Sequence, residues 1–190
     1  MSSWQYEIRR SSRRTIGIEV TPNGILVRAP RRASIAEIER VLKKHSRWID
    51  SHMQKLADDA ACAAQAGPLT EAELKALADA ARVRIPERVA YYAPLIGIDP
   101  ARIGRITIRH QKTRWGSCSA KGNLNFNCLL MLTPPEVLDS VVVHELCHMK
   151  EMNHSARFYD EVLRVFPEYK KWHRWLKEHG GAILKRLPQR

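Results

Sequence analysis

Two histidines separated by three residues are the clearest chemical signal in the sequence. His144 and His148 lie one turn apart if the segment is an α-helix, so both imidazoles can reach one ion. Glu145 lies beside the same face, where its carboxylate can hold a water molecule and accept its proton. A zinc ion lowers the pKa of such a water from about 15.7 toward about 7. The pattern therefore predicts zinc-dependent hydrolysis with Glu145 as the general base.

A catalytic zinc site needs a third protein ligand and leaves its fourth position to water. His154 is the candidate, six residues after His148. In a continuous helix its ring would point about 240° around the axis from His148, so the helix must end first. We expect it to end at Met152 or Asn153, with Asn153 at or just past the C-cap, where a left-handed conformation is common. The alternative third ligands are Glu151 and Glu168.

The elements that position this motif indicate an α+β fold. Alternation over residues 4–10, 15–20 and 24–29 predicts two or three antiparallel strands. A helix capped by Ser34 follows and continues into an alanine-rich stretch, which ends at Gly67-Pro68. That break is the predicted domain boundary. It separates N-terminal β-strands and a helix, residues 1–67, from a metal-dependent hydrolase core, residues 68–190.

Within residues 68–190, a first helix begins after Thr70. Alternating residues then predict two strands, 105–110 and 124–130, joined through a turn at Gly122-Asn123. The motif lies in the next predicted helix, from about Glu136 to Met152. A C-terminal helical region, residues 155–179, is expected to end at Gly180-Gly181.

Composition bounds the environment of the chain. No run of 18 apolar residues exists, which argues against a membrane span, and the first residues lack the apolar segment of a secretory signal. Four scattered cysteines do not form a disulfide pattern. These features predict a cytoplasmic protein with reduced thiols.

The 190-residue chain carries a formal net charge of +12, and many of its cations lie near the N-terminus. Arg9, Arg10, Arg13 and Arg14 are part of this group. One interpretation is a solvated basic face that keeps the protein soluble. The other is a patch for nucleic acid, a nucleotide or another anionic partner.

Longer stretches around the motif resemble the YgjP-like metallopeptidase family, which is related to the WLM and SprT-like zincins and to the minimal gluzincins. The resemblance covers nearly the whole layout and is most specific between Arg114 and Phe158. The segments that carry it are Thr113-Arg114-Trp115-Gly116-Ser117-Cys118-Ser119, Gly122-Asn123-Leu124-Asn125-Phe126-Asn127, Pro134-Pro135-Glu136-Val137-Leu138-Asp139, Val142-Val143-His144-Glu145-Leu146-Cys147-His148 and Asn153-His154-Ser155 with Phe158.

The resemblance implies a zincin-like catalytic core with a small sheet and an active-site helix. It implies His144, His148 and His154 as zinc ligands, Glu145 as general base, and a peptide or protein substrate. The metzincins also have the spacing from His148 to His154. However, Glu151 replaces their glycine and no methionine follows the site, which excludes them.

Further residues are candidates for substrate binding. Zincins pair extended substrate with an edge strand, and residues 124–130 are the candidate by resemblance. Asn125 and Asn127 would then project from one face, toward substrate or solvent. Arg114 and Trp115 could frame the cleft, although tryptophan at such a position often belongs to the core. Arg157 could stabilise an oxyanion or form a surface ion pair. Weaker electrophile candidates are Tyr159, Tyr169 and His173.

Two other functions compete with peptide hydrolysis. The same metal site could cleave a phosphoanhydride, with the basic N-terminal residues holding phosphates; a UTP pyrophosphatase label has been attached to some proteins of this kind. A third possibility is a nucleic-acid-binding protein with a structural metal. An open fourth zinc position argues against it, because structural zinc sites are closed by four protein ligands.

Overall fold

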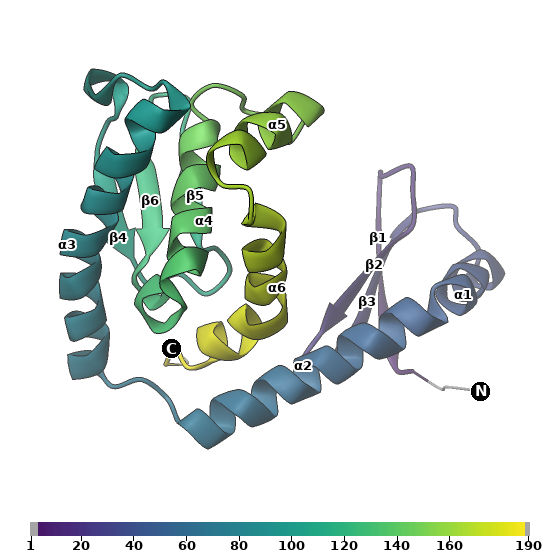
Figure 1. The fold of residues 1–190 in the computed structure, drawn as a ribbon. Helices are drawn as coiled ribbons and strands as arrows, with labels where there is room; N and C mark the ends of the chain where they lie inside the picture. The colour runs from purple at the N-terminus through teal and green to yellow at the C-terminus, as the bar shows by residue number, and fades with distance from the viewer. Residues whose placement is uncertain (1–3, 189–190) are drawn as a thin grey trace. The chain divides into compact units, whose positions relative to one another are not determined.

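The computed structural model describes residues 4–188 and divides the chain into two compact units, which meet between Cys62 and Ala63. This division falls inside helix α2 (Ser46–Ala66), shortly before the Gly67-Pro68 break at which the sequence places a domain boundary. Each unit has its own hydrophobic core. Figure 1 identifies the helices and strands of both units.

The N-terminal unit contains a three-stranded sheet with the order β1-β3-β2. Its strands are β1 (Tyr6–Ser11), β2 (Gly17–Thr21) and β3 (Gly24–Pro30). The prediction of purely antiparallel strands was wrong, because β1 runs parallel to β3. The tight turn between β2 and β3 makes these two strands antiparallel neighbours, so β1 pairs with the other edge of β3. The alternation of apolar and polar residues identifies strands but does not show which strands pair.

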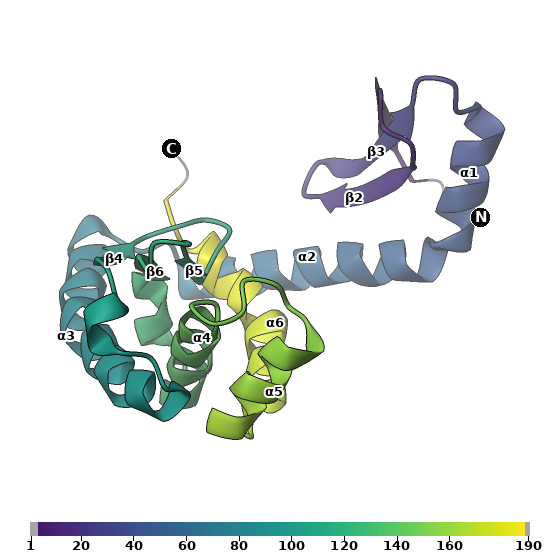
Figure 2. The ribbon, with the colours of Figure 1, turned by 90° about the horizontal axis from the view of Figure 1, so that it is seen from above.

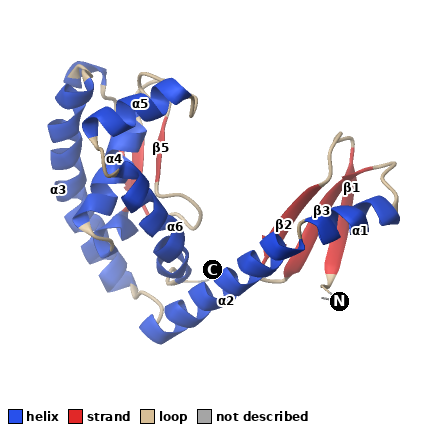
Figure 3. Cartoon of the chain, turned by 45° about the vertical axis from the view of Figure 1, so that its right-hand side comes forward, coloured by secondary structure: helices blue, strands red, loops and turns tan. Residues whose placement is uncertain are grey.

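Helix α1 (Ile35–Lys44) covers this sheet (Figure 3). Ser34 begins it with the predicted capping box, in which the Ser34 Oγ accepts from the Glu37 N–H and the Glu37 carboxylate accepts from the Ser34 N–H. Val27, Ile38 and Ile49 are fully or almost fully buried where β3, α1 and the start of α2 meet. Burial of these side chains holds the unit together.

The C-terminal unit is built on a second three-stranded sheet with the order β4-β6-β5. Strand β4 (Ile106–Arg109) follows the long helix α3 (Glu71–Ile96) and the short 3-10 helix η1 (Pro100–Arg102). Figure 2 shows α3 and α4 (Pro135–Cys147) along one face of this sheet. Leu124 and Phe126 point into this layer and are at most 1% exposed. The α+β class and the small sheet with an accompanying helix are as expected.

An ion pair fixes α3 against α4. The Arg88 guanidinium binds both carboxylate oxygens of Asp139, at 2.7 and 2.8 Å, and Tyr92 Oη donates to the same carboxylate at 3.1 Å. This bidentate pair is mostly buried, which makes its geometry specific as well as favourable. The helix that carries the metal motif is therefore joined to α3 by directional contacts in addition to apolar packing.

The strand predicted for residues 124–130 is shorter and lies elsewhere in the sheet. Strand β6 is Leu124–Asn127, and the chain then forms the 3-10 helix η2 (Cys128–Leu132). Strand β6 is also the middle strand, between parallel β4 and antiparallel β5 (Gly116–Cys118). The prediction that it is an edge strand was therefore wrong. The run Cys128 to Leu130 is buried throughout and does not alternate, which is the local sign that the strand has ended.

Asn127 makes the turn at the end of β6. Its Oδ1 accepts from the Leu129 N–H, and its Nδ2 donates to the carbonyls of Gln111 and Arg114 at 2.8 and 2.9 Å. The residue is 0% exposed. Its amide therefore fixes the loop that leads from β4 into β5.

Helices α5 (Ala156–Val165) and α6 (Tyr169–Lys185) complete the unit. The C-terminal helix was predicted to end at Gly180-Gly181, but α6 continues through both glycines. Gly180 is buried under Trp115, and a Cβ there would lie 3.0 Å from the indole ring. The glycine thus serves close packing inside the helix and does not end it. None of the helices in residues 4–188 is long and apolar enough to cross a membrane.

Asn127→Ala should lower the free energy of unfolding by about 1 to 3 kcal/mol, because it leaves one buried N–H and two part-buried carbonyls without their partner. Urea unfolding followed by circular dichroism measures the change. Asn125→Ala is the matched control two residues away: this side chain is half-buried and makes one hydrogen bond, to Ser117 at 3.2 Å. An equal loss in both variants would mean that the Asn127 amide has no special structural role.

Candidate metal site

Helix α4 carries the first two histidines and ends earlier than predicted. Its last residue is Cys147, and His148 is the C-cap, whereas the expected end was Met152 or Asn153. No residue other than glycine in the described part of the chain has a positive φ, so the left-handed conformation expected for Asn153 was also wrong.

The physical reason is a tightening of the last turn. The Met149 N–H donates to the Leu146 carbonyl at 2.9 Å and the Lys150 N–H to the Cys147 carbonyl at 3.0 Å. These bonds span three residues, which is how a helix end can turn away without a left-handed residue. Ser155 then begins α5, and its Oγ accepts from the Phe158 N–H. His154 therefore lies just before a new helix, on a segment that has left the axis of α4.

The three histidines converge through their Nε2 atoms. The Nε2 of His144 lies 3.2 Å from that of His148 and 3.1 Å from that of His154. One ring nitrogen from each residue lies within 4.8 Å of the other two. Neither Glu151 nor Glu168 is a member of this group, and Glu168 forms an ion pair with Lys171.

The opposite nitrogens of two rings are fixed by protein groups. The Nδ1 of His148 lies 3.1 Å from the Glu151 carbonyl, which can only accept, so the proton of a neutral His148 is on Nδ1. The Nδ1 of His144 lies 2.8 Å from the Tyr169 hydroxyl, which in turn lies 3.4 Å from the Nδ1 of His173. In the consistent pattern, His144 donates to Tyr169 and Tyr169 donates to His173. Both Nε2 atoms then present lone pairs to the centre.

The electrostatics of the rings favour the neutral form. Burial, reinforced by His148, His154 and His173, lowers the pKa of His144 to about 3. Burial also lowers the pKa of His148 below its ordinary value. At neutral pH both rings are therefore neutral, and their Nε2 atoms lie 3.2 Å apart. A cation between these two nitrogens would be stabilised by both lone pairs.

The spacing fits a tetrahedral ion. Imidazole nitrogens at about 2.0 to 2.1 Å from such an ion are about 3.3 Å apart, close to the observed 3.1 and 3.2 Å. Imidazole ligands suit zinc, copper, iron and nickel. Phe158 is 0% exposed, and its ring centroid lies 4.6 to 4.9 Å from those of the three histidines. Its apolar ring lines one side of the site, which excludes water there.

Glu145 is held beside this cluster but is not one of its three converging groups. The residue is 6% exposed and lies against Gly116 of β5, where an added Cβ would be 2.6 Å from its Oε1. Burial raises the pKa of Glu145 to about 7, and a hydrogen bond from the backbone N–H of Cys118 opposes the shift. Sequence reasoning missed Gly116, although its position in the Trp115-Gly116-Ser117 segment hinted at a close approach.

The predicted substrate-binding asparagines do not reach the cluster. Gly116, which contacts Glu145, is paired with Phe126 on the neighbouring strand β6. Both residues therefore lie on the same face of the sheet, the one toward α4. Asn125 and Asn127 alternate with Phe126 and point to the other face. Asn125 bonds Ser117 there, and Asn127 has its amide occupied by the main chain.

The two arginines named from the sequence are both exposed. Arg114 lies in the loop before β5, and its carbonyl accepts from Asn127. Arg157 lies in the first turn of α5, three residues after His154. Trp115 packs on the core, as expected for a structural residue. Of the electrophile candidates, Tyr169 is instead the buried hydrogen-bond partner of His144.

The basic N-terminal residues are partly engaged within the N-terminal unit. Arg9 forms an ion pair with Glu7. Arg10 donates to the carbonyls of Pro30, Arg31 and Ala33, the last at 2.6 Å. At least one of these cations is therefore a structural residue that closes the loop after β3.

The comparisons with known proteins, like the histidine cluster, indicate a metallopeptidase. A family model described as YgjP-like, metallopeptidase domain, matches residues 14–76 and 69–179. Solved structures similar to the chain include the metallopeptidase zymogens abylysin from Pyrococcus abyssi and jannalysin from Methanocaldococcus jannaschii. Both are 24% identical to it over 49% of this chain; the matches cover 92% and 93% of theirs, with TM-scores of 0.44 and 0.43. No curated protein gives a significant match.

The family model covers most of the sequence and includes the whole segment from His144 to His154. It implies a metal and a peptide or protein substrate, and it gives no support to a nucleotide or nucleic-acid partner. The resemblance seen in the sequence motifs is thereby confirmed, and the chain belongs to the YgjP-like metallopeptidase family.

Proposed function

We propose that this protein is a zinc-dependent peptidase in which His144, His148 and His154 hold the ion and Glu145 is the general base. The observation that carries the proposal is the convergence of the three histidine nitrogens beside a buried carboxylate. Membership of a metallopeptidase family supplies the class of reaction. A zinc ion at this position supplies a Lewis acid and lowers the pKa of a water molecule to about 7.

Glu145 has the environment of a proton-transfer group. Its carboxyl is buried, and its raised pKa of about 7 lies near neutral pH, where a group both accepts and returns a proton efficiently. In peptide hydrolysis it would take a proton from the attacking water and deliver it to the departing amine. The absence of a side chain at Gly116 leaves room for the carboxylate between α4 and β5.

Strand β5 is the proposed docking strand for substrate, in place of residues 124–130. It is an edge strand of the sheet, with β6 as its partner. The Asn127 N–H donates to the Trp115 carbonyl, so alternate residues of β5 face β6 and Gly116 presents its N–H and C=O to the open edge. Extended peptide pairing there would run beside Glu145, with affinity from main-chain hydrogen bonds.

The segment that carries His154 is anchored to the end of α3. Lys150 Nζ donates to the Ile96 carbonyl at 3.0 Å and to Glu161 Oε1 at 2.6 Å. Arg164 binds the same carboxylate at 2.8 Å and the Leu95 carbonyl at 3.0 Å. These contacts tie the turn after α4 and helix α5 to one fixed point, which we propose positions His154 for the metal.

Each of the variants His144→Ala, His148→Ala and His154→Ala should lose most of the zinc that the purified protein binds in a one-to-one ratio, because two imidazoles cannot hold a catalytic ion tightly. Metal analysis after dialysis against zinc buffer measures this. His179→Ala removes an exposed histidine that stacks on Trp175 and is the control. Full occupancy in the His154 variant would assign the third ligand elsewhere.

Glu145→Gln should keep zinc and lower the rate of peptide hydrolysis by about 10²- to 10⁴-fold, because the amide cannot accept a proton. Cleavage of a quenched fluorescent peptide library by the zinc-loaded protein measures the rate. Glu136→Gln, on the exposed first turn of the same helix, should cleave at the unaltered rate. Equal rates in both variants would contradict the assignment of the base.

Lys150→Met should weaken zinc binding by about tenfold while leaving the three ligands in place, because the ligand-bearing segment loses its anchor. Competition with a chelating dye measures the dissociation constant. Lys121→Met, at an exposed lysine of the β5–β6 turn, should bind zinc as tightly as the unmodified chain. If both variants bind equally well, the anchor has no part in forming the site.

A further inference from the structure

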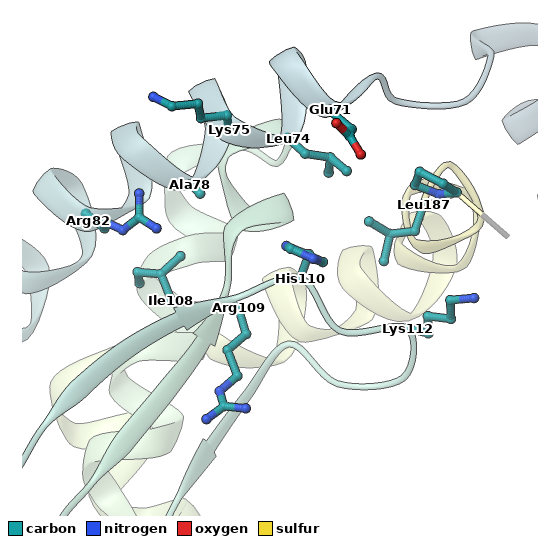
Figure 4. Close-up of a pocket in the computed structure, with 11 residues that line it drawn as sticks. Glu71, Leu74, Lys75, Ala78, Arg82, Ile108, Arg109, His110, Lys112 and Leu187 are labelled. Carbon is teal, nitrogen blue, oxygen red and sulfur yellow. The ribbon is translucent and has the colours of Figure 1, made fainter. Parts of the chain in front are cut away.

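A cavity lies at the β4 edge of the C-terminal sheet, opposite the β5 edge. It has a volume of about 860 Å³ and lies between the N-terminal half of α3, the end of β4 and the residues at 187 and 188. Figure 4 shows Ile108 directed toward α3, with His110 and Leu187 facing the cavity and Arg109 turned to the other side of the strand. We call this cavity the α3–β4 groove. Its apolar lining includes Leu74, Ala78, Ile108 and Leu187.

The main chain of β4 is open along this groove. Strand β4 has β6 as its partner in the sheet and lies at the edge. The Arg105 carbonyl accepts from the Leu124 N–H at 3.0 Å, so Arg105, Thr107 and Arg109 face β6. Alternate residues point the other way, which leaves the N–H and C=O groups of Ile106 and Ile108 at the open edge. Such an edge is a template for an added extended strand.

The rim of the groove is strongly basic. Lys75, Arg82 and Lys112 line it, together with His110 and one acid, Glu71, whereas the side chain of Arg109 is turned away. Asp79 compensates part of this charge, because it binds both Lys75 and Arg82. Within residues 4–188, no carboxylate forms an ion pair with Lys112. A ligand that brings carboxylates to Lys112 and to the partly compensated Arg82 would therefore be attracted.

We propose that the α3–β4 groove binds an extended acidic peptide segment of a protein partner. Main-chain bonds to Ile106 and Ile108 would align the segment along β4. Its apolar side chains would meet Leu74, Ala78 and Leu187, and its carboxylates would meet the basic rim. A small anion fits less well, since the cations in Figure 4 point in different directions and do not converge. Nucleic acid is disfavoured because no tryptophan, tyrosine or phenylalanine lines the groove for base stacking.

This site is separate from the histidine cluster. None of the groove residues belongs to the cluster or contacts Glu145, and β6 lies between β4 and the strand that covers Glu145. Binding at the groove therefore does not depend on hydrolysis. It can be measured on a chain that has lost the metal.

The test uses fluorescence anisotropy with the full chain and a labelled eight-residue peptide that alternates valine and glutamate. We expect binding that weakens with salt and falls at least about tenfold, or 1.4 kcal/mol, in the double variant Arg82→Glu, Lys112→Glu. The matched control Lys121→Glu, Lys170→Glu reverses two exposed lysines outside the groove and should bind like the unmodified chain. Circular dichroism verifies that both variants are folded.

Two further probes separate the features that carry the proposal. A peptide methylated on alternate backbone nitrogens keeps its charge and should bind at least about tenfold more weakly, because it cannot pair with β4. Binding should persist in His144→Ala and Glu145→Gln, which distinguishes the groove from the proposed hydrolytic site. Equal binding by a valine–lysine peptide, an unchanged affinity in the Arg82, Lys112 variant, or tighter binding of single-stranded nucleic acid lost in that variant would each overturn the proposal.

Discussion

The convergence of three imidazoles on one point is the constraint on which the C-terminal unit depends. His144 is partly buried, and its Nε2 lies at about hydrogen-bond distance from those of two other histidines. Such an arrangement is unfavourable on its own, because a buried polar group without a partner costs about 1 to 3 kcal/mol. The surroundings therefore have to hold it in place. Tyr169 and the Glu151 carbonyl fix the outer nitrogens of His144 and His148, Phe158 packs against all three rings, and the C-terminal end of α3 anchors the following turn.

The two edges of the C-terminal sheet differ in their chemistry. At β5, a glycine allows the strand to approach α4 so closely that a carboxylate becomes buried. At β4, the strand is flanked by cations and an apolar hollow. The middle strand β6 contributes no group to either edge, but its Asn127 fixes the loop from which β5 begins. The order of the strands in the sheet thus determines which residues lie at an open edge, where a ligand can bind.

Much of the site could be predicted from local spacing. His144 and His148 follow from helical periodicity, and His154 follows from the need for a third ligand together with a helix end. The location of that end was wrong, because short-range hydrogen bonds after Leu146 were enough to turn the chain. The direction of the two asparagines stayed open for a different reason. The alternating pattern of the strand shows that Asn125 and Asn127 share a face. Only the pairing of Gly116 with Phe126 shows which face of the sheet lies toward Glu145. Strand order and parallel pairing likewise depend on contacts between distant segments, which periodicity does not encode.

The histidine cluster and the surroundings of Glu145 differ in the sequence separation of the residues that form them. The three histidines occupy a short segment, from position 144 to 154, whereas the contact that buries Glu145 joins it to Gly116 in the sheet. Contacts of low sequence separation form early and rapidly in folding, and those between distant segments form later. An ion could therefore be captured by a nascent α4 and its following turn before the sheet has docked. During folding, binding of the proposed metal would then precede the burial of Glu145, the proposed base, so that the proposed hydrolytic activity would arise only in a nearly native chain.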